Sequence, residues 1–205
     1  MIVECITVGP LMENAYLLGD KKTKEAAIID PGDEAKKIIG TLEKHSLKCK
    51  YILLTHAHVD HVAGVKELAA VTGADVLMHK ADSLLLKAAP IQAVAFGIRP
   101  FIAPRIAKYI EDGEIIQVGN ISVRVIHTPG HSPGSVCFLA ENVIFAGDTL
   151  FQSSIGRTDI PGGDYEALIE GVRKKIFTLP DDTEVLPGHG PATSVGFEKE
   201  NNPFF

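Results

Sequence analysis

The sequence is poor in cysteine and in aromatic residues, and it has no tryptophan. Its three cysteines, Cys5, Cys49 and Cys137, are far apart and match no CxxC pattern. An odd number of widely spaced cysteines argues against a disulfide framework and is typical of proteins from a reducing compartment. Each lies in a stretch that reads as a strand or its edge, so all three are expected to be small buried apolar side chains.

Long hydrophobic runs are also missing. No apolar stretch approaches the roughly 20 residues that a bilayer crossing needs. Residues 1–5 lack the basic start and the unbroken apolar run of a signal peptide. We therefore expect a cytoplasmic protein with no membrane association. The net charge of −6 argues against electrostatic binding to nucleic acid, so no nucleic-acid partner is expected.

The remaining composition is that of a soluble globular protein, with 45% hydrophobic and 22% charged residues. No low-complexity segment or linker divides the chain, so residues 1–205 are predicted to form one domain. Apolar runs with strand spacing alternate with runs of helical spacing. The predicted strands are Ile2–Val8, Ala15–Leu18, Glu25–Asp30, Tyr51–Leu54, Asp75–His79, Ile115–Val118, Ile121–His127, Val136–Leu139, Val143–Ala146 and Thr183–Leu186. The predicted helices are a helix capped by Asp33 and ending near His45, then Asp60–Val71, Lys80–Ala88 and Tyr165–Phe177, the last capped by Asp164.

The segment Ala89–Ile110 contains Pro90, Pro100 and Pro104 but is rich in apolar residues. Proline interrupts helices, so this segment is interpreted as irregular or broken helix that could form a flap over a site.

The order of the predicted elements repeats once along the chain. In the first half a strand pair ends at Asp30, a helix follows, and a strand ends at His56. In the second half a strand pair ends at Asp148, a helix follows, and a strand ends at His189. Two such halves, each with helices on one face, predict an α/β fold, a four-layer αββα sandwich. Polar residues at the strand ends would then converge along one edge, where we place the site.

The run Thr55-His56-Ala57-His58-Val59-Asp60-His61 is the strongest functional signal. Its imidazole and carboxylate groups are the ligands that suit zinc and neighbouring transition metals. The run follows an apolar strand and precedes a helix. It can therefore supply ligands to two ions, because residues two apart in a loop can face one point while Asp60 and His61 face another. A chance cluster of histidines on the surface would not explain the buried strand before it.

Three later residues complete a set of ligands for two metals. Each lies on a turn rich in glycine or proline directly after a predicted strand, where side chains can converge. Alone, each would be read as a helix cap or a surface histidine. They are His131, Asp148 and His189.

These motifs, in this order, resemble the metallo-β-lactamase superfamily, and within it the glyoxalase II-like hydrolases. The resemblance covers essentially the whole chain. It implies that one metal is held by His56, His58 and His131 and the other by Asp60, His61 and His189, with Asp148 bridging both. It also implies that Asp60 and Asp148 are catalytic. The true β-lactamases of the superfamily carry a different residue at the position of His61, which disfavours antibiotic hydrolysis.

The chemistry that this resemblance implies is hydrolysis by a metal-bound hydroxide. Two divalent ions about 3.5–4 Å apart can lower the pKa of a shared water towards about 7 and polarise a carbonyl. The expected cofactors are two divalent ions, with zinc preferred over iron or manganese. The expected substrate is a small-molecule thioester, as for hydroxyacylglutathione hydrolase. Only 16 residues follow His189, so the chain resembles the compact bacterial type that lacks the C-terminal helical domain.

Two other enzyme classes stay open. A persulfide dioxygenase would share the HxHxDH run and Gly156-Arg157-Thr158-Asp159 but would use a single iron. Such enzymes usually have an Asp-Tyr pair after the last histidine, where this chain has Gly190-Pro191. A lactonase would use the same metals. A metal-binding module that has lost catalysis is disfavoured because the ligand set is intact.

Several further residues have two interpretations. Asp30 is interpreted either as orienting a ligand or as capping the turn at Pro31-Gly32. Arg157 could bind a substrate carboxylate or pair with Asp159, and the sequence favours neither. His127 is expected to be buried and hydrogen-bonded rather than a ligand.

Overall fold

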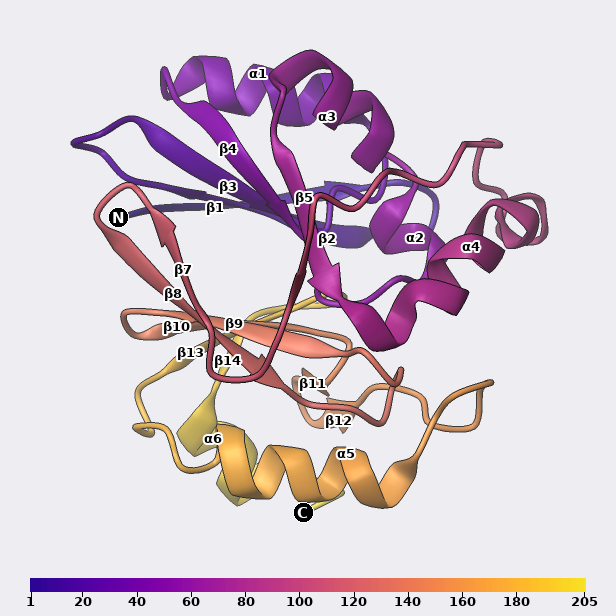
Figure 1. The fold of residues 1–205 in the computed structure, drawn as a ribbon. Helices are drawn as coiled ribbons and strands as arrows, with labels where there is room; N and C mark the ends of the chain where they lie inside the picture. Colours follow the sequence, from indigo (N-terminus) through magenta and orange to yellow (C-terminus); the bar gives the residue numbers. More distant parts are fainter.

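Two six-stranded sheets form the centre of the molecule (Figure 1). The computed structural model describes all residues 1–205. The first sheet has the order β1 (Ile2–Val8), β2 (Glu13–Gly19), β3 (Glu25–Ile29), β4 (Lys48–Leu53), β5 (Asp75–His79) and β6 (Lys108–Ile110). The second has the order β14 (Thr193–Ser194), β13 (Glu184–Pro187), β10 (Val143–Gly147), β9 (Val136–Ala140), β8 (Ile121–His127) and β7 (Ile115–Val118). A separate hairpin joins β11 (Leu150–Phe151) to β12 (Ser154–Ile155).

Helices cover the outer face of each sheet, so the chain forms the predicted αββα sandwich. The helices α1 (Ala35–Lys44) and α3 (Val65–Thr72) lie on the first sheet, and α5 (Tyr165–Gly171) and α6 (Val195–Asn201) lie on the second (Figure 1). Three apolar clusters separate these layers: one under α1 and α3, one between the sheets, and one under α5. The alternation of side chains along each strand explains this arrangement, because a strand between two layers must be apolar on both faces.

The predicted repeat of elements is present in the structure. In the first half β2 and β3 pair antiparallel, and α1 leads to β4, which pairs parallel with β3. In the second half β9 and β10 pair antiparallel, and α5 leads to β13, which pairs parallel with β10. The parallel pairs place the carboxyl ends of β3 and β4, and of β10 and β13, at matching edges of the two sheets.

The helices near the site differ from their predicted forms. Asp33 does not cap α1, because Glu34 occupies the N-cap position in a left-handed conformation. The predicted helix Asp60–Val71 is two helices, α2 (Val59–Val62) and α3. The chain bends between them at Gly64, because the amide of Gly64 donates hydrogen bonds to the carbonyl oxygens of Pro31 and Gly32. The predicted helix Tyr165–Phe177 changes from α5 to one wider π-helical turn over Val172–Ile176.

The segment Ala89–Ile110 is a broken helix, as predicted, but it also contains a strand. A short 3₁₀ turn, Lys80–Asp82, leads into α4 (Ser83–Gln92), which contains Pro90 and passes into a second 3₁₀ turn, Ala93–Phe96. The chain then forms β6 at the edge of the first sheet, which the sequence pattern did not indicate. The short elements β11, β12, β14 and α6 were also missed.

The cysteine prediction is correct for two residues and wrong for one. Cys49 and Cys137 are buried in β4 and β9, but Cys5 in β1 is exposed. The reason is that β1 is an edge strand whose residues alternate between outward and inward positions. None of the helices combines the length and the apolar character that a membrane crossing requires.

Phe138, on β9 between the two sheets, is fully buried and tests the packing of the layers. We expect Phe138→Ala to lower the free energy of unfolding by about 3–5 kcal/mol, because the truncation leaves a cavity that the two sheets cannot close. The exposed Val71→Ala in α3 should change it by less than about 0.5 kcal/mol. Urea unfolding of both variants measures the difference. Equal effects would contradict the placement of Phe138 in the core.

Candidate metal centre

All seven side chains predicted as metal ligands lie at one rim of the sandwich. They lie in or directly after the loops at the carboxyl ends of four strands: β4 supplies the HxHxDH run, β8 the turn with His131, β10 Asp148 and β13 His189. The helix α2 begins inside the run, and this places Asp60 and His61 one turn away from His56 and His58. The two halves of the fold therefore bring together residues that are up to 133 positions apart in the sequence.

Six of these seven side chains form two groups of three, and a further group of potential ligand atoms combines His56 and His61 with Asp30. One group is His56, His58 and His131, and the other is Asp60, His61 and His189; within each group the candidate ligand atoms lie within 4.8 Å of one another. His58 Nδ1 lies 2.8 Å from His131 Nε2, and His189 Nε2 lies 3.2 Å from Asp60 Oδ2. These are the two sets that the resemblance to the metallo-β-lactamase superfamily implied.

Asp148 lies between the two groups. Its Oδ1 is 3.4 Å from His61 Nε2, and its Oδ2 is 3.6 Å from His131 Nε2 and 3.9 Å from His189 Nε2. One carboxylate therefore faces histidines of both groups. This position suits the bridging role predicted for it.

The donor atoms fit a divalent cation. His56 Nε2, His61 Nε2 and Asp148 Oδ1 are buried and have no hydrogen-bond partner. Buried polar atoms without a partner are destabilising, and native proteins rarely keep them without a reason. Imidazole nitrogen and carboxylate oxygen are the donors that zinc and its neighbours in the transition series accept. A cation among these atoms would satisfy all three.

Hydrogen bonds on the far side of three histidines orient their rings. His56 Nδ1 lies 3.0 Å from Thr55 Oγ1, His61 Nδ1 lies 3.0 Å from Asp30 Oδ2, and His131 Nδ1 lies 2.8 Å from the carbonyl oxygen of Arg157. A proton on each Nδ1 can be donated to these oxygens, which leaves the lone pair of each Nε2 directed into the site. Such partners fix the ring and its tautomer in metal centres.

Asp30 connects two of these contacts, so its predicted role in orienting a ligand agrees with the geometry. It is almost fully buried, and it accepts hydrogen bonds from the Thr55 amide (2.7 Å) and the Thr55 hydroxyl (2.5 Å) as well as the contact with His61. The same carboxylate thus holds the start of the HxHxDH run against β3. The alternative role as a simple turn cap does not account for these contacts.

The electrostatics of the site separate its histidines. Burial, together with the neighbouring imidazoles of His131 and His61, lowers the pKa of His58 to about 4, and burial lowers the pKa of His56 as well. Burial also acts on His61, but the charges of Asp148 and Asp60 outweigh it and raise the pKa of that imidazole. His56 and His58 are therefore neutral, which is the form that binds metal. The carboxylates of Asp148 and Asp60 favour a positive charge at the position of His61.

Two buried carboxylates near the site were missed by the sequence analysis. Glu13 lies in β2 with both carboxylate oxygens buried and without partners, and its Oε1 is 3.7 Å from His61 Nδ1. Burial raises the pKa of Glu13 well above its ordinary value. Asp82 precedes α4 and is also almost fully buried. Neither residue has ligand spacing or a glycine-rich turn around it, so no local signal marks it.

Asp82 joins the two loops that carry the histidines of the first group. It accepts hydrogen bonds from the amides of Ala57 (2.9 Å) and Gly134 (2.6 Å) and from the hydroxyl of Ser132 (2.8 Å). Ala57 stands between His56 and His58, and Ser132 follows His131. The spacing between these histidines therefore depends on a buried carboxylate that contacts none of them.

A cleft of about 470 Å³ opens above the two groups. This volume lies within the usual range for small-molecule sites. Arg157 lines the cleft, and its guanidinium also makes two hydrogen bonds to Asp159, at 2.9 and 3.0 Å. The ion pair named as one alternative for Arg157 is thus present, and its contact with substrate stays a prediction. His127 is half-buried; its Nε2 donates a hydrogen bond to the carbonyl oxygen of Pro133, and its ring stacks on His79, away from the centre.

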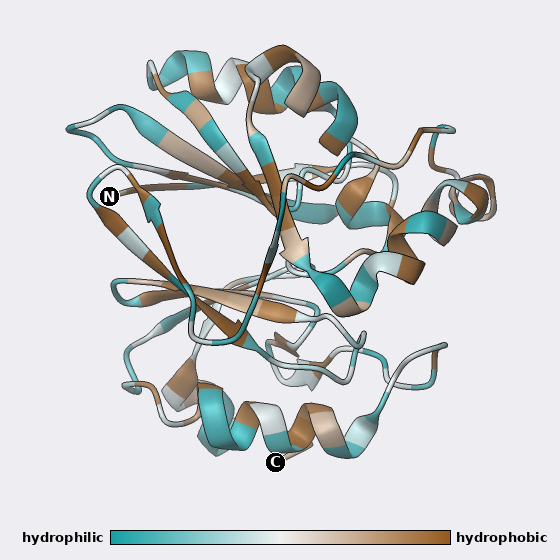
Figure 2. Cartoon of the chain, in the orientation of Figure 1, coloured by the Kyte–Doolittle hydropathy of each residue, from teal (hydrophilic) through white to brown (hydrophobic).

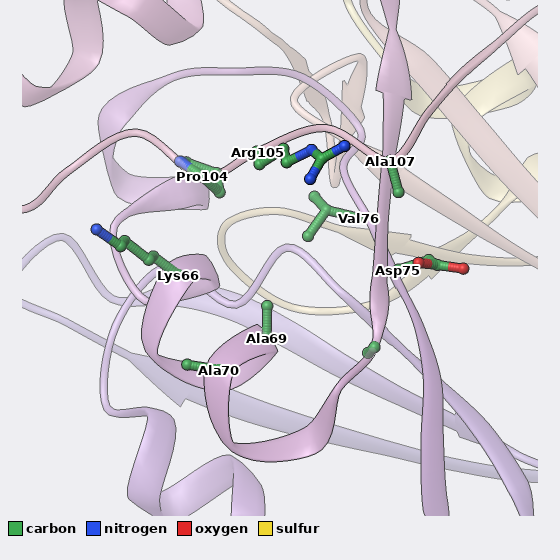
Figure 3. Close-up of a pocket in the computed structure, with 9 residues that line it drawn as sticks. Lys66, Ala69, Ala70, Asp75, Val76, Pro104, Arg105 and Ala107 are labelled. Atoms are coloured by element: carbon green, nitrogen blue, oxygen red, sulfur yellow. The ribbon is translucent and has the colours of Figure 1, made fainter.

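A second hollow of about 530 Å³ lies between α3 and the segment that leads into β6 (Figure 3). Ala69 of α3 points towards Val76 across it. Its lining contains no histidine and no cysteine, and Asp75 is its single carboxylate. It therefore lacks the donors of a second metal centre.

The chain is similar to known proteins over nearly all of its length. The model of the metallo-beta-lactamase superfamily matches residues 8–189. Hydroxyacylglutathione hydrolase GloC of Haemophilus influenzae is 40% identical over 213 residues, an alignment that covers 100% of this chain and 98% of that protein.

Two solved structures agree closely with the fold. The structure of TTHA1623 in a di-iron-bound form has a TM-score of 0.90 and 40% identity, and it covers 99% of this chain and 100% of that one. The structure of BLEG-1 B3 metallo-beta-lactamase has the same TM-score and identity, with 99% of both chains covered.

Asp30→Asn tests whether the contact with His61 supports metal binding. The amide keeps the shape of the carboxylate but loses its charge, so we expect metal affinity to fall by about 10- to 100-fold. Competition with a coloured chelator measures this affinity. Asp75→Asn, at an exposed position on β5, is the matched control and should leave it unchanged. Equal affinities in both variants would show that Asp30 does not act through His61.

Asp82→Asn tests the connection between the two histidine loops. An amide cannot accept all three hydrogen bonds, so we expect the free energy of unfolding to fall by about 2–3 kcal/mol. We also expect weaker binding of metal at the group of His56, His58 and His131, which chelator competition on the folded protein can measure. The exposed Asp182→Asn is the control. Lower stability with unaltered metal affinity would mean that Asp82 serves only the packing of α4.

Proposed function

Because the chain belongs to the metallo-beta-lactamase superfamily, we propose that it is a metal-dependent hydrolase that cleaves thioesters, in the manner of a hydroxyacylglutathione hydrolase. The observation that carries this proposal is the pair of ligand groups with Asp148 between them, placed at the floor of a cleft. The full-length similarity to GloC supports the choice of a thioester.

The proposed reaction adds water to the thioester carbonyl. The water oxygen forms the new C–O bond, the C–S bond breaks, and the thiol leaves with a proton from the water. When bound, a pair of divalent ions supplies an acidified water and a polarised carbonyl. We propose that His56, His58 and His131 would hold one ion, that Asp60, His61 and His189 would hold the other, and that Asp148 would contact both.

The protein's own contribution is position and charge. Asp60 and Asp148 place two negative charges among five imidazoles, so the site favours cations but does not neutralise two divalent ions completely. The Nδ1 contacts with Thr55, Asp30 and the Arg157 carbonyl keep the Nε2 atoms directed inward without substrate. Such a preorganised site needs little rearrangement when the reaction starts. No serine or cysteine nucleophile is required.

Two observations support a two-metal hydrolase over a single-iron persulfide dioxygenase. A single-iron persulfide dioxygenase would need three ligands, whereas all seven candidate side chains converge here. The di-iron form of TTHA1623, at 40% identity, also contains a pair of metals. A lactonase would use the same centre and the same carbonyl chemistry, so the substrate alone separates it from a thioesterase.

Metal analysis and a substrate panel on one preparation test the proposal. We expect about two divalent ions per chain and thiol release from S-D-lactoylglutathione or another acyl thioester, with slower turnover of a lactone and of a β-lactam. One iron per chain together with oxygen uptake on glutathione persulfide would favour the dioxygenase instead. Two bound ions without turnover of any of these substrates would contradict the proposal.

Asp148→Ala tests the position of the shared carboxylate. Because Asp148 faces histidines of both groups, we expect the variant to lose turnover and to bind about one ion or fewer instead of about two. Asp181→Ala, an exposed aspartate paired with Lys199, is the control and should keep both properties. Unchanged turnover in Asp148→Ala would show that the assignment is wrong.

A further inference from the structure

The wall of the cleft above the metal centre is mainly apolar. Apart from the candidate ligands, its lining consists mainly of apolar side chains from the loop before β2, from the first residue of α2, from α4 and the turn after it, and from the loop before α5. These side chains are Leu11, Val59, Leu85, Ala95, Phe96, Ile160 and Pro161. The polar lining residues besides the candidate ligands are Gln92 and Arg157.

Positive charge is scarce in this cleft. Arg157 is the one lysine or arginine in its lining, and both of its hydrogen bonds to Asp159 are formed, so its charge is already paired. Glutathione carries two carboxylates and an ammonium group, and arginine and lysine side chains form the strongest hydrogen bonds to carboxylates. The cleft offers none besides Arg157.

The apolar wall continues outward along the broken helix. Phe96 is 50% exposed at the rim, and Val94 in the turn after α4 is 72% exposed. Figure 2 shows hydrophobic residues on α4 and the turn that follows it, beside the loops at the strand ends. Apolar side chains that gather beside a site mark a binding surface for an apolar group.

We propose that the acyl group of the substrate is an uncharged apolar chain that lies against Phe96 and Leu85. This inference rests on the proposed thioester hydrolysis only for the identity of the bond that breaks. Phe96 and Leu85 are then specificity-determining residues. The thiol part of the substrate contributes little to recognition, because the cleft has no free cation to bind its charges.

Binding of thioethers tests this without turnover. In a thioether a methylene replaces the carbonyl, so the metal-loaded protein can bind the molecule but cannot hydrolyse it. We expect the affinity of S-butyl-, S-hexyl- and S-octyl-N-acetylcysteamine to rise by about three- to tenfold for every two carbons, since each buried methylene favours binding. S-hexylglutathione, which has the same alkyl chain and the charges of glutathione, should bind within about threefold of its N-acetylcysteamine counterpart. Calorimetry measures all four.

Two variants locate the effect on the wall. We expect Phe96→Ala to weaken binding of the S-octyl compound by about tenfold and that of the S-butyl compound by less than about threefold, because a short chain does not reach the rim. Ile91→Ala lies on the same segment but outside the cleft, and it should leave both affinities unchanged.

The outcomes separate this inference from the proposed function. The apolar acyl site would be overturned if affinity did not depend on chain length. It would also be overturned if S-hexylglutathione bound more than tenfold tighter than S-hexyl-N-acetylcysteamine. Equal losses in Phe96→Ala and Ile91→Ala would overturn the role of Phe96. The matching acyl thioesters, assayed in parallel for thiol release, test the hydrolysis itself. If thioether affinity rises with chain length but no thiol is released from these thioesters, the proposed reaction is rejected and the apolar binding site is retained.

Discussion

The structure depends on a cluster of imidazoles and carboxylates that are buried together at the rim of two stacked sheets. Burial of polar atoms without partners costs free energy, and His56, His61 and Asp148 each keep such an atom at the centre. Apolar side chains would pack there without this cost. The unpaired donors are therefore the part of the fold that function requires, and a cation is the ligand that their chemistry fits.

The surrounding fold keeps these atoms in place. The parallel pairs β3–β4 and β10–β13 bring the ends of strands from both halves to one rim, and the apolar cluster between the sheets fixes the distance between the halves. Buried carboxylates then set the loops: Asp30 holds Thr55 and His61, and Asp82 joins the loop of Ala57 to that of Ser132. These contacts shape the backbone and the rings before any ion binds, which is how a protein imposes a coordination geometry.

The cleft and the metal centre have different origins in the chain. The metal centre uses residues at the ends of sheet strands, where the backbone is rigid. The apolar wall uses Leu85 on α4 and Phe96 in the 3₁₀ turn after it, outside the sheets. A fold of this kind can retain its chemistry while the substrate changes, because the loops that line the cleft vary independently of the strands that carry the ligands.

The sequence by itself determined the αββα architecture, the family and the set of seven candidate ligands. These follow from local signals: apolar periodicity marks each strand, and the HxHxDH run and the glycine-rich turns with His131, Asp148 and His189 mark where each strand ends. The tertiary structure decided what depends on distant contacts. The break at Gly64 follows from hydrogen bonds to the loop of Pro31, and the role of Asp82 follows from partners 25 to 52 residues away. Neither the buried Glu13 nor the apolar wall at Phe96 has a local signal, because burial is set by the elements that pack on a residue and not by its neighbours in the chain.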